Sequence, residues 1–365
     1  MMQAKLWALL GRKAGDNAQV LALAEAVGLP FEEKHIHARS WEIVPHLLLG
    51  PTLAGIDKGA SSPLAPPWPD LVISAGRRNE PVAQWIRAQS DGAVRLVHVG
   101  RPWAPPSTWD LIVTTPQYFI HDAPNVLQIP LPLRRITRAE VDQAARRIVP
   151  RLAHLPRPLT TVLIGGDSGP FVFTPEKARR LAQGVNRLVS QTGGAALVTD
   201  SPRTPKAAAQ AFRDALNVPA ETFWWHDPDT ATENPYLGFL GMADRFVVTG
   251  ESMSMMAEAA SLARPLYLFD PGDPPGTWWR HRHSFRHKPL SHALAMRLAP
   301  VRMRRDVSRL QDALRRDGRA RWLDEAPHLI AAGETWAATA QLDPMEDAQR
   351  AAARVRALLT RPARD

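Results

Sequence analysis

One stretch of the chain combines a buried strand, a glycine turn and a helix in direct succession. Phe246 to Thr249 is a short apolar run with β-branched residues, which is typical of a parallel strand buried on both faces. Gly250 allows a sharp backbone turn, and Ser252 or Ser254 can then cap a helix. Leu266 to Phe269 is the expected next strand. This order of elements predicts a parallel sheet flanked by helices, an α/β fold.

The same pattern recurs along the chain in two successive series. Pro150, Pro156 and Pro158 separate the series, and each series opens with a strand, a glycine-containing loop and a helix. We therefore expect two doubly wound parallel-sheet domains, residues 1–150 and 151–342, followed by a C-terminal helix in residues 343–365. The other expected strands are Leu6 to Leu10, Phe31 to Ile36, the run from Asp70 into Gly76, Val94 to Val99, Trp109 to Pro116, Leu159 to Ile164, Ala195 to Thr199 and Phe223 to Trp225.

The composition restricts the chemistry and the cellular location expected of the chain. Its 365 residues leave room for two hydrophobic cores, and it contains no cysteine, which excludes disulfides and thiol catalysis. No apolar run approaches the ~18 residues that a membrane span needs. The first apolar run, Leu6 to Leu10, is too short for the core of a signal peptide. We therefore expect a cytoplasmic protein.

Positive charge is concentrated late in the chain. The net charge is +9, and residues 280–321 contain thirteen Lys or Arg but three Asp. Such a segment can attract nucleic acid, anionic lipid or an anionic substrate, or it can form a solvated surface. No RNA-binding motif or zinc-finger spacing accompanies it, so we expect no nucleic-acid partner. No metal site is expected either, because arginine and lysine neighbours would repel a cation from the four histidines of this segment, His281, His283, His287 and His292.

Three strand-end turns of the second series carry groups suited to an anion. In a parallel sheet the turns at Gly165–Gly169, Ser201–Thr204 and Gly250–Ser254 lie along one edge. They offer backbone N–H groups, hydroxyls and an arginine, a set that suits a diphosphate. Ser254 and Glu258 are four residues apart and share one helix face, where one suits a phosphate and the other a ribose diol. The alternative is a serine-capped helix with a solvated glutamate.

The first series presents a polar loop at the corresponding edge of its own sheet. The loop after Leu10 contains Gly15, Asp16, Asn17 and Gln19, and it follows the first strand, where a ligand would meet it. It is neither a GxGxxG fingerprint nor a P-loop. Asp16 is either a functional carboxylate or the cap of the helix that follows.

Several short motifs span most of residues 5–270, namely Gly15-Asp16-Asn17-Ala18-Gln19, Pro69-Asp70-Leu71-Val72-Ile73, Leu163-Ile164-Gly165-Gly166, Ser201-Pro202-Arg203-Thr204-Pro205, Asn234-Pro235-Tyr236 and the segment from Thr249 to Glu258. Together they resemble those of a known family, the bacterial relatives of the plant mitochondrial-fission (elongated-mitochondria) protein. The loop after Asp110 departs from the expected Pro-x-His-Asp pattern and reads Pro116-Gln117-Tyr118. No histidine role is therefore assigned there.

This resemblance implies the fold of GT-B glycosyltransferases, two Rossmann-like domains that face a cleft, and a nucleotide-sugar as substrate. Asp16 would act as general base toward an acceptor hydroxyl, and the reaction would be inverting and independent of metals and cofactors. The donor would contact Gly165, Gly166, Ser168, Ser201, Arg203, Thr204, Asn234, Tyr236, Ser252, Ser254 and Glu258 in the second domain. The acceptor side would include Gly15, Asn17, Gln19, Arg77 and Arg101 in the first domain.

Three functions remain open on the sequence. The first is transfer of a sugar to an envelope or lipid-linked acceptor, with Arg302, Arg304 and Arg305 docking the protein on an anionic inner membrane. The second is a non-catalytic peripheral scaffold that keeps the fold, as the plant relative suggests. The third is a sugar-nucleotide epimerase of the same two-domain architecture.

Overall fold

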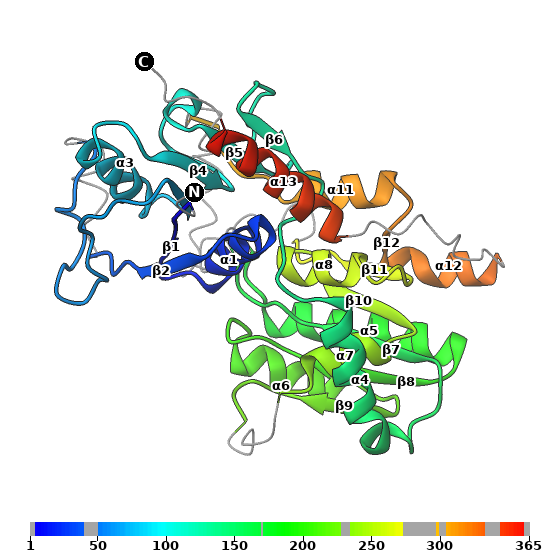
Figure 1. Ribbon diagram of the computed structural model, residues 1–365. Helices are drawn as coiled ribbons and strands as arrows, with labels where there is room; N and C mark the ends of the chain where they lie inside the picture. Colours follow the sequence, from blue (N-terminus) through cyan, green and yellow to red (C-terminus); the bar gives the residue numbers. More distant parts are fainter. Residues whose placement is uncertain are drawn as a thin grey trace. The chain divides into compact units, whose positions relative to one another are not determined.

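Two six-stranded parallel sheets carry the fold in the computed structural model, which describes residues 4–39, 50–168, 171–227, 234–272, 297–298, 304–332 and 344–360. The chain divides into two units. Unit 1 comprises Met1–Arg135, Ala299–Asp306 and Asp343–Asp365, and unit 2 comprises Ile136–Leu298 and Val307–Leu342. In Figure 1 the blue and cyan elements and the red C-terminal helix belong to unit 1, and the green, yellow and orange helices and strands belong to unit 2.

The unit 1 sheet has the strand order β2-β1-β3-β4-β5-β6, and every neighbouring pair is parallel. The chain places β2 on one side of β1 and then returns to place β3 on the other side. The carboxyl ends of β1 and β3 are therefore the point where the winding reverses, which is where open α/β sheets bind ligands. The strands are β1 (Leu6–Leu10), β2 (Phe31–His35), β3 (Leu71–Ala75), β4 (Arg95–Val99), β5 (Leu111–Thr114) and β6 (Val126–Gln128).

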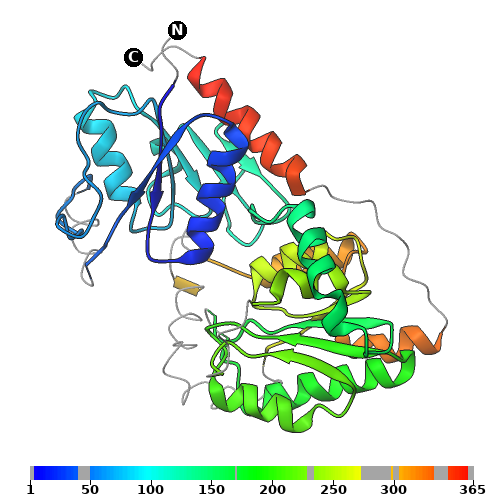
Figure 2. The same ribbon diagram turned by 60° about the horizontal axis from the view of Figure 1, so that its bottom comes forward.

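Helices cover both faces of this sheet. On one face α1 and α13 pack together over β1, β3, β4 and β5, and on the other face α3 packs against Val72, Leu96 and Ile112. Both ribbon views show α13 lying alongside α1 (Figures 1 and 2). The helices are α1 (Ala14–Val27), α3 (Glu80–Gln89) and α13 (Pro344–Leu359), with a 3-10 turn η1 (Pro106–Thr108).

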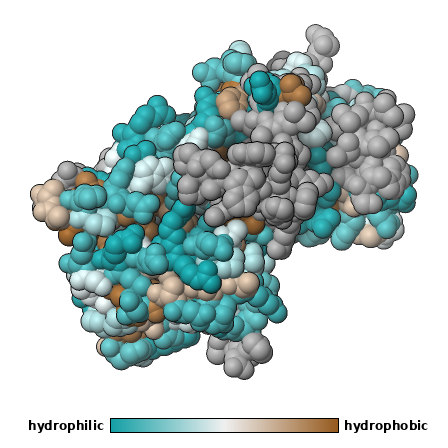
Figure 3. Space-filling model, turned by 180° about the vertical axis from the view of Figure 1, so that it is seen from behind, coloured by the Kyte–Doolittle hydropathy of each residue, from teal (hydrophilic) through white to brown (hydrophobic). Residues whose placement is uncertain are grey.

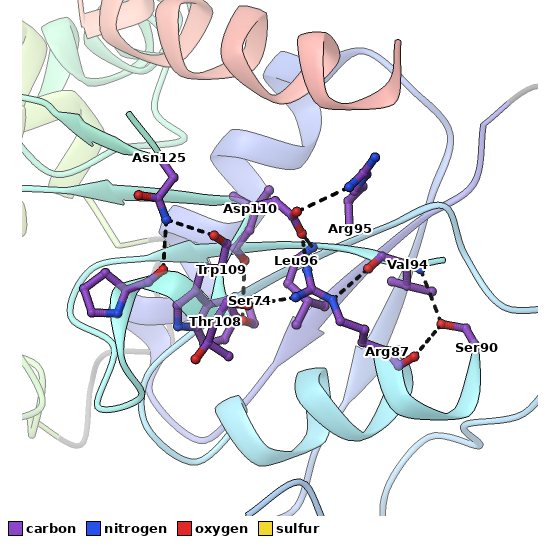
Figure 4. A network of polar contacts seen from close by, with 12 residues as sticks. Ser74, Arg87, Ser90, Val94, Arg95, Leu96, Thr108, Trp109, Asp110 and Asn125 are labelled. Carbon is purple, nitrogen blue, oxygen red and sulfur yellow. Dashed lines mark hydrogen bonds and ion pairs between the residues drawn. The ribbon is translucent and has the colours of Figure 1, made fainter. Parts of the chain in front are cut away.

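A buried charge ties together the amino ends of two strands in this sheet (Figure 4). The Asp110 carboxylate, just before β5, accepts hydrogen bonds from the Arg87 guanidinium of α3 and from the backbone N–H of Leu96 in β4, the latter at 2.7 Å. Arg87 also donates to the carbonyl oxygens of Val94 at 3.1 Å and Thr108 at 2.8 Å. This network holds the edge of the sheet opposite the strand-end loops, so its role is structural.

The unit 2 sheet has the order β12-β11-β10-β7-β8-β9, again with parallel pairs throughout. Counted from β7, this is the 3-2-1-4-5-6 order of the Rossmann fold, and its winding reverses between β7 and β10. The strands are β7 (Leu159–Leu163), β8 (Ala195–Thr199), β9 (Ala220–Phe223), β10 (Arg245–Thr249), β11 (Leu266–Phe269) and β12 (Arg321–Trp322).

Helices α5, α6 and α12 cover one face of the unit 2 sheet, and α4 and α7 cover the other. Helix α8 follows β10 directly. The helices are α4 (Arg138–Leu152), α5 (Pro175–Thr192), α6 (Lys206–Ala215), α7 (Tyr236–Met242), α8 (Met253–Ala260), α11 (Ser308–Arg316) and α12 (Ala326–Ala331), with a 3-10 turn η3 (Leu323–Glu325).

The fold class expected from the sequence is confirmed, since both units are doubly wound parallel sheets. The expected strand at Phe223 to Trp225 is wrong in position, because β9 ends at Phe223. The units also divide the chain differently from the expected 1–150, 151–342 and 343–365. Helix α4 belongs to unit 2 because it packs on α7. The two helices approach closely at Gly241, where a Cβ would lie 2.6 Å from the Cβ of Ala145. Helix α13 belongs to unit 1 because it packs on α1.

Candidate functional site

The carboxyl edge of the unit 2 sheet brings three strand-end turns into contact. Gly165 and Gly166 follow β7, the turn from Ser201 to Thr204 follows β8, and Glu251 and Ser252 follow β10. Because β7 and β10 are neighbours at the point where the winding reverses, the turn of each strand lies against that of the other.

Only glycine fits at the two positions after β7. A Cβ on Gly165 would lie 2.3 Å from Glu251 Oε1 and 2.5 Å from Ser252 Cβ. Gly166 has φ +91°, and a Cβ there would lie 2.5 Å from the carbonyl oxygen of Arg203. The glycine pair therefore lets the turns after β8 and β10 close on the end of β7.

The hydroxyls of Ser201 and Thr204 hold the turn after β8 in place. Ser201 Oγ donates to the carbonyl oxygen of Gly165 and accepts from the Arg203 N–H at 3.2 Å. Thr204 Oγ1 accepts from the Ser201 N–H at 3.2 Å, and the Thr204 N–H donates to the Ser201 carbonyl at 2.9 Å. Both residues are buried, so they fix the turn that carries Arg203.

Arg203 and Ser252 form the polar centre of this edge. The Arg203 guanidinium donates to the Asp167 carbonyl at 2.9 Å and to Ser252 Oγ at 3.4 Å. Ser252 is the N-cap of α8, but its side chain makes no capping hydrogen bond. A guanidinium beside the N-terminus of a helix is a favourable environment for a phosphate.

Helix α8 presents the other two predicted side chains. Ser254 is exposed in its first turn, and Glu258, one turn later, is half-buried. The Tyr236 hydroxyl donates a hydrogen bond to Glu258 Oε2, and the Asn234 side chain accepts from the Tyr236 N–H at 2.9 Å at the start of α7. Ser168 is half-buried and exchanges backbone hydrogen bonds with Phe171 at 3.1 Å.

Glu251, which the sequence reasoning did not single out, lies buried beneath this edge with 1% of its surface exposed. Its Oε1 accepts from Thr249 Oγ1 at 2.9 Å, and among the described residues Oε2 has no hydrogen-bond partner. Burial raises its pKa from 4.5 to about 7; hydrogen bonds from its own backbone, the Thr249 hydroxyl and Gly166, and the charge of Arg203, act against this shift.

Asp200, at the end of β8, is a second buried carboxyl that sequence reasoning missed. Burial raises its pKa from 3.8 to about 6, opposed mainly by a hydrogen bond from the Trp225 N–H at 2.6 Å and by the charges of His226 and Arg213. Carboxyls with raised pKa values are frequent at functional sites. A signal was present in the sequence, since Asp200 directly follows β8 and Glu251 stands two positions after β10.

Unit 1 has a pocket of about 560 Å³ at its own point of reversal, the carboxyl ends of β1 and β3. All residues that line it belong to unit 1. Five of the residues predicted from the sequence line it, namely Asp16, Asn17, Gln19, Arg77 and Arg101. Gly15, in the first turn of α1, is exposed, and its carbonyl accepts from Gln19 Nε2 at 3.3 Å.

The Asp16 carboxylate faces the turn after β3. A Cβ on Gly76, which has φ +73°, would lie 2.8 Å from Asp16 Oδ2. Asp16 is the third residue of α1, whose N-cap is Lys13, so the alternative of a helix cap is wrong. Asn17 holds the loop by exchanging two 2.8 Å hydrogen bonds with the backbone of Gly11. The aspartate carboxylate is 33% exposed and lines the pocket.

The structure describes two of the three arginines predicted to dock on a membrane, Arg304 and Arg305. Arg302 and the four histidines from His281 to His292 lie outside the described residues. Arg304 is half-buried. Arg305 lines the unit 1 pocket and donates from Nε to Gln117 Oε1 at 3.0 Å.

Within the described residues, no group of three or more His, Cys, Asp or Glu side chains is arranged to hold a metal ion. No helix in that part of the chain is both long and apolar enough to cross a membrane. On the face shown in Figure 3, hydrophobic residues appear as small patches between hydrophilic ones.

These features define the class of protein: an α/β protein of GT-B-like architecture, with two doubly wound sheets and polar groups at the point of reversal of each. The chain belongs to the mitochondrial fission ELM1 family, whose family model matches residues 14–359. The match extends beyond the motifs of residues 5–270 from which the resemblance was inferred.

Two relatives and one solved structure are similar to this chain. An uncharacterised protein of Rickettsia prowazekii (strain Madrid E) is 24% identical over 300 residues, 73% of this chain and 83% of that protein. The mitochondrial fission protein ELM1 of Arabidopsis thaliana is 25% identical over 223 residues, 55% of this chain and 51% of the plant protein. The UDP-GlcNAc 2-epimerase of Neisseria meningitidis, solved with UDP-GlcNAc bound, is 10% identical with a TM-score of 0.52, over 98% of this chain and all of that one. This last likeness shows a shared fold.

Proposed function

We propose that this protein is an inverting glycosyltransferase that binds a nucleotide-sugar donor at the carboxyl edge of unit 2. The observation that carries the proposal is the packing of the turns after β7, β8 and β10, which places Arg203 and Ser252 3.4 Å apart at the N-terminus of α8. This is where a doubly wound sheet binds a nucleotide diphosphate. A fold neighbour, the Neisseria epimerase, holds UDP-GlcNAc in its solved structure.

In this proposal each group at the edge has one task. The Arg203 guanidinium, Ser252 Oγ and the first N–H groups of α8 bind the diphosphate, with Ser254 beside them. Glu258, oriented by the Tyr236 hydroxyl, accepts hydrogen bonds from the ribose diol. Gly165, Gly166, Ser201 and Thr204 position these groups, and Ser168 and Asn234 flank them.

Transfer then requires an acceptor held in unit 1. Asp16 takes the proton of the acceptor hydroxyl as its oxygen attacks the anomeric carbon of the donor. The bond from that carbon to the diphosphate breaks, and the nucleoside diphosphate leaves with the electron pair. The cationic Arg203 and the dipole of α8 stabilise the charge that develops on the leaving group, so the chemistry proposed needs no metal ion.

The test is ligand-dependent stabilisation with UDP-, GDP-, CMP- and dTDP-sugars. A ligand at about 100 times its dissociation constant stabilises the folded protein by about 2.7 kcal/mol, which gives a measurable thermal shift. Glu258→Ala removes the ribose contact and should weaken binding by about 1–3 kcal/mol, roughly 5- to 150-fold. Asp214→Ala, at an exposed acid in the same unit, is the matched control and should bind like the wild type.

The alternatives make different predictions in the same experiment. If no nucleotide-sugar stabilises the wild type, the protein binds no such donor and the scaffold function takes the place of the transferase. If one binds but its sugar is recovered with inverted configuration still attached to the nucleotide, the protein is an epimerase. Docking of Arg302, Arg304 and Arg305 on an anionic membrane is part of the proposal, and vesicle sedimentation tests it.

A further inference from the structure

The unit 1 pocket is strongly cationic. Among the residues that line it, six carry a positive charge and one, Asp16, is a carboxylate. The six basic residues are Arg12, Lys13, Arg77, Arg78, Arg101 and Arg305. Five of them lie in the loops after β1, β3 and β4, and the sixth, Arg305, is distant in sequence. Segments far apart along the chain therefore contribute basic residues to one cavity.

Aromatic rings hold two of these guanidinium groups over the pocket. The Arg77 guanidinium carbon lies 4.8 Å from the centre of the Trp103 ring, and that of Arg101 lies 5.7 Å from the centre of the Tyr118 ring. Both rings line the pocket. Stacking on a ring fixes the plane of a guanidinium, and its N–H groups point outward in that plane.

The remaining contacts fix the loops that carry these charges. Both oxygens of the buried Glu80 carboxylate accept backbone N–H groups of the loop after β4, from Trp103 at 2.7 Å and Ala104 at 2.8 Å. Arg305 is fixed by its bond to Gln117 and by the Asp306 N–H, which donates to the Gln117 carbonyl at 2.9 Å.

The guanidinium groups are close enough to repel one another. Burial lowers the pKa of Arg101 from its ordinary value; Tyr118 and Glu80 raise it, and Arg305 and Arg77 lower it further. Like charges gathered in one cavity cost folding free energy, which a bound anion would recover.

We infer that this pocket binds the phosphate of the acceptor, as a phosphomonoester or a diphosphate. Paired guanidinium groups match the oxygens of phosphate in a bidentate manner. A volume of about 560 Å³ accommodates a small phosphorylated molecule. Asp16 lies in the same cavity, so phosphate binding sets the acceptor hydroxyl beside the proposed base. The role as acceptor site rests on the proposed function, and the binding of phosphate does not.

The test measures binding of inorganic pyrophosphate by calorimetry at low ionic strength. Arg203→Gln serves as the background for every protein, because pyrophosphate would otherwise also bind the proposed donor site. In this background we expect Arg77→Gln and Arg101→Gln each to weaken binding at least tenfold. Arg135→Gln, at an exposed arginine of unit 1 that pairs with Glu25, should leave it unchanged.

A second variant separates charge from folding. Asp16→Asn removes the one carboxylate among the lining residues, so pyrophosphate should bind several-fold more tightly, a gain that unfolding cannot mimic. Equal binding by all variants, or weaker binding by Asp16→Asn, would overturn the inference. So would preferential binding of a single-stranded RNA oligonucleotide over pyrophosphate that depends on Arg77 and Arg101.

Two further arms identify the source of the phosphate and keep the two proposals apart. If phosphatidic-acid vesicles bind and pyrophosphate displaces them, the phosphate is lipid-borne; if pyrophosphate binds and the vesicles do not, the acceptor is soluble. Glu258→Ala should retain full pyrophosphate binding in the same background. Pyrophosphate binding without any nucleotide-sugar binding would therefore leave the pocket standing and remove the transferase.

Discussion

Glu251→Gln should make the protein more stable at alkaline pH and leave it almost unchanged at acidic pH. The buried carboxyl has a pKa of about 7 in the folded protein against 4.5 as its ordinary value. Its contribution to stability is therefore fully present below pH 4.5 and is lost as the pH rises through 7, because the folded state must then hold a buried negative charge. Glutamine keeps the shape and the acceptor for Thr249 Oγ1 without that charge.

The magnitude follows from the difference between the two pKa values. About 2.5 pKa units at about 1.36 kcal/mol each correspond to a loss of about 3 kcal/mol at pH 8 for the wild type, and under about 1 kcal/mol at pH 5. For a domain of this size that is a difference in Tm of roughly 6–12 °C at pH 8. Asp200, with a pKa raised to about 6, lowers stability in the same direction, and it does so equally in both proteins.

The assay is urea unfolding followed by tryptophan fluorescence at pH 5, 6, 7 and 8. The informative quantity is the difference between variant and wild type as a function of pH, which removes any constant packing cost of the amide. Asp214→Asn, at an exposed position, is the control and should show no such pH-dependent difference. A stability difference of the same size at every pH, or one that grows toward acidic pH, would refute the raised pKa of the buried Glu251 carboxyl.

Two further variants test the packing of the turns in unit 2 and the proposed general base in unit 1. Gly166→Ala should destabilise the protein by about 2 kcal/mol or more in chemical unfolding, because its Cβ meets the Arg203 carbonyl and its φ is +91°; Gly193→Ala, with φ +71° but open space around it, should cost about 1 kcal/mol, and equal costs would contradict the close packing. Asp16→Asn should leave nucleotide-sugar affinity intact and lower turnover by roughly 10²–10⁴-fold, whereas unchanged turnover would remove this residue as the base.

The strands and the cores of both units could be predicted because burial on both faces of a parallel sheet demands continuous apolar runs. Runs such as Leu159 to Leu163 are fully buried in the structure. Short edge strands carry a weaker signal, which is why β6 and β12 were missed and β9 was placed too late. The start of α4 is set by local contacts, since Thr137 and Glu140 form a capping box there.

The site was less accessible to prediction because its key properties arise from contacts between distant segments. Glu251 reads locally as an ordinary acid before a helix, and its burial depends on Gly165, 86 positions earlier in the numbering of the chain. Arg305 belongs by sequence to a basic stretch, yet it lines a pocket built mainly from residues 11–118. Pattern reasoning identifies residue types at strand ends; it does not identify which of them become buried or gathered.

The two points of reversal also differ in their charged groups. The strand-end turns of unit 2 carry Arg203 together with Glu251 and Asp200, two buried acids whose raised pKa values favour their neutral forms. In the proposed function, that edge binds a diphosphate through the N-terminus of α8 and the Arg203 guanidinium, and the Glu258 contact with the ribose selects the nucleoside. The unit 1 pocket has six cations and one carboxylate, so charge dominates its selectivity. The ligands proposed above, a donor recognised by its nucleoside and an acceptor recognised by its phosphate, match this difference in charge between the two sites.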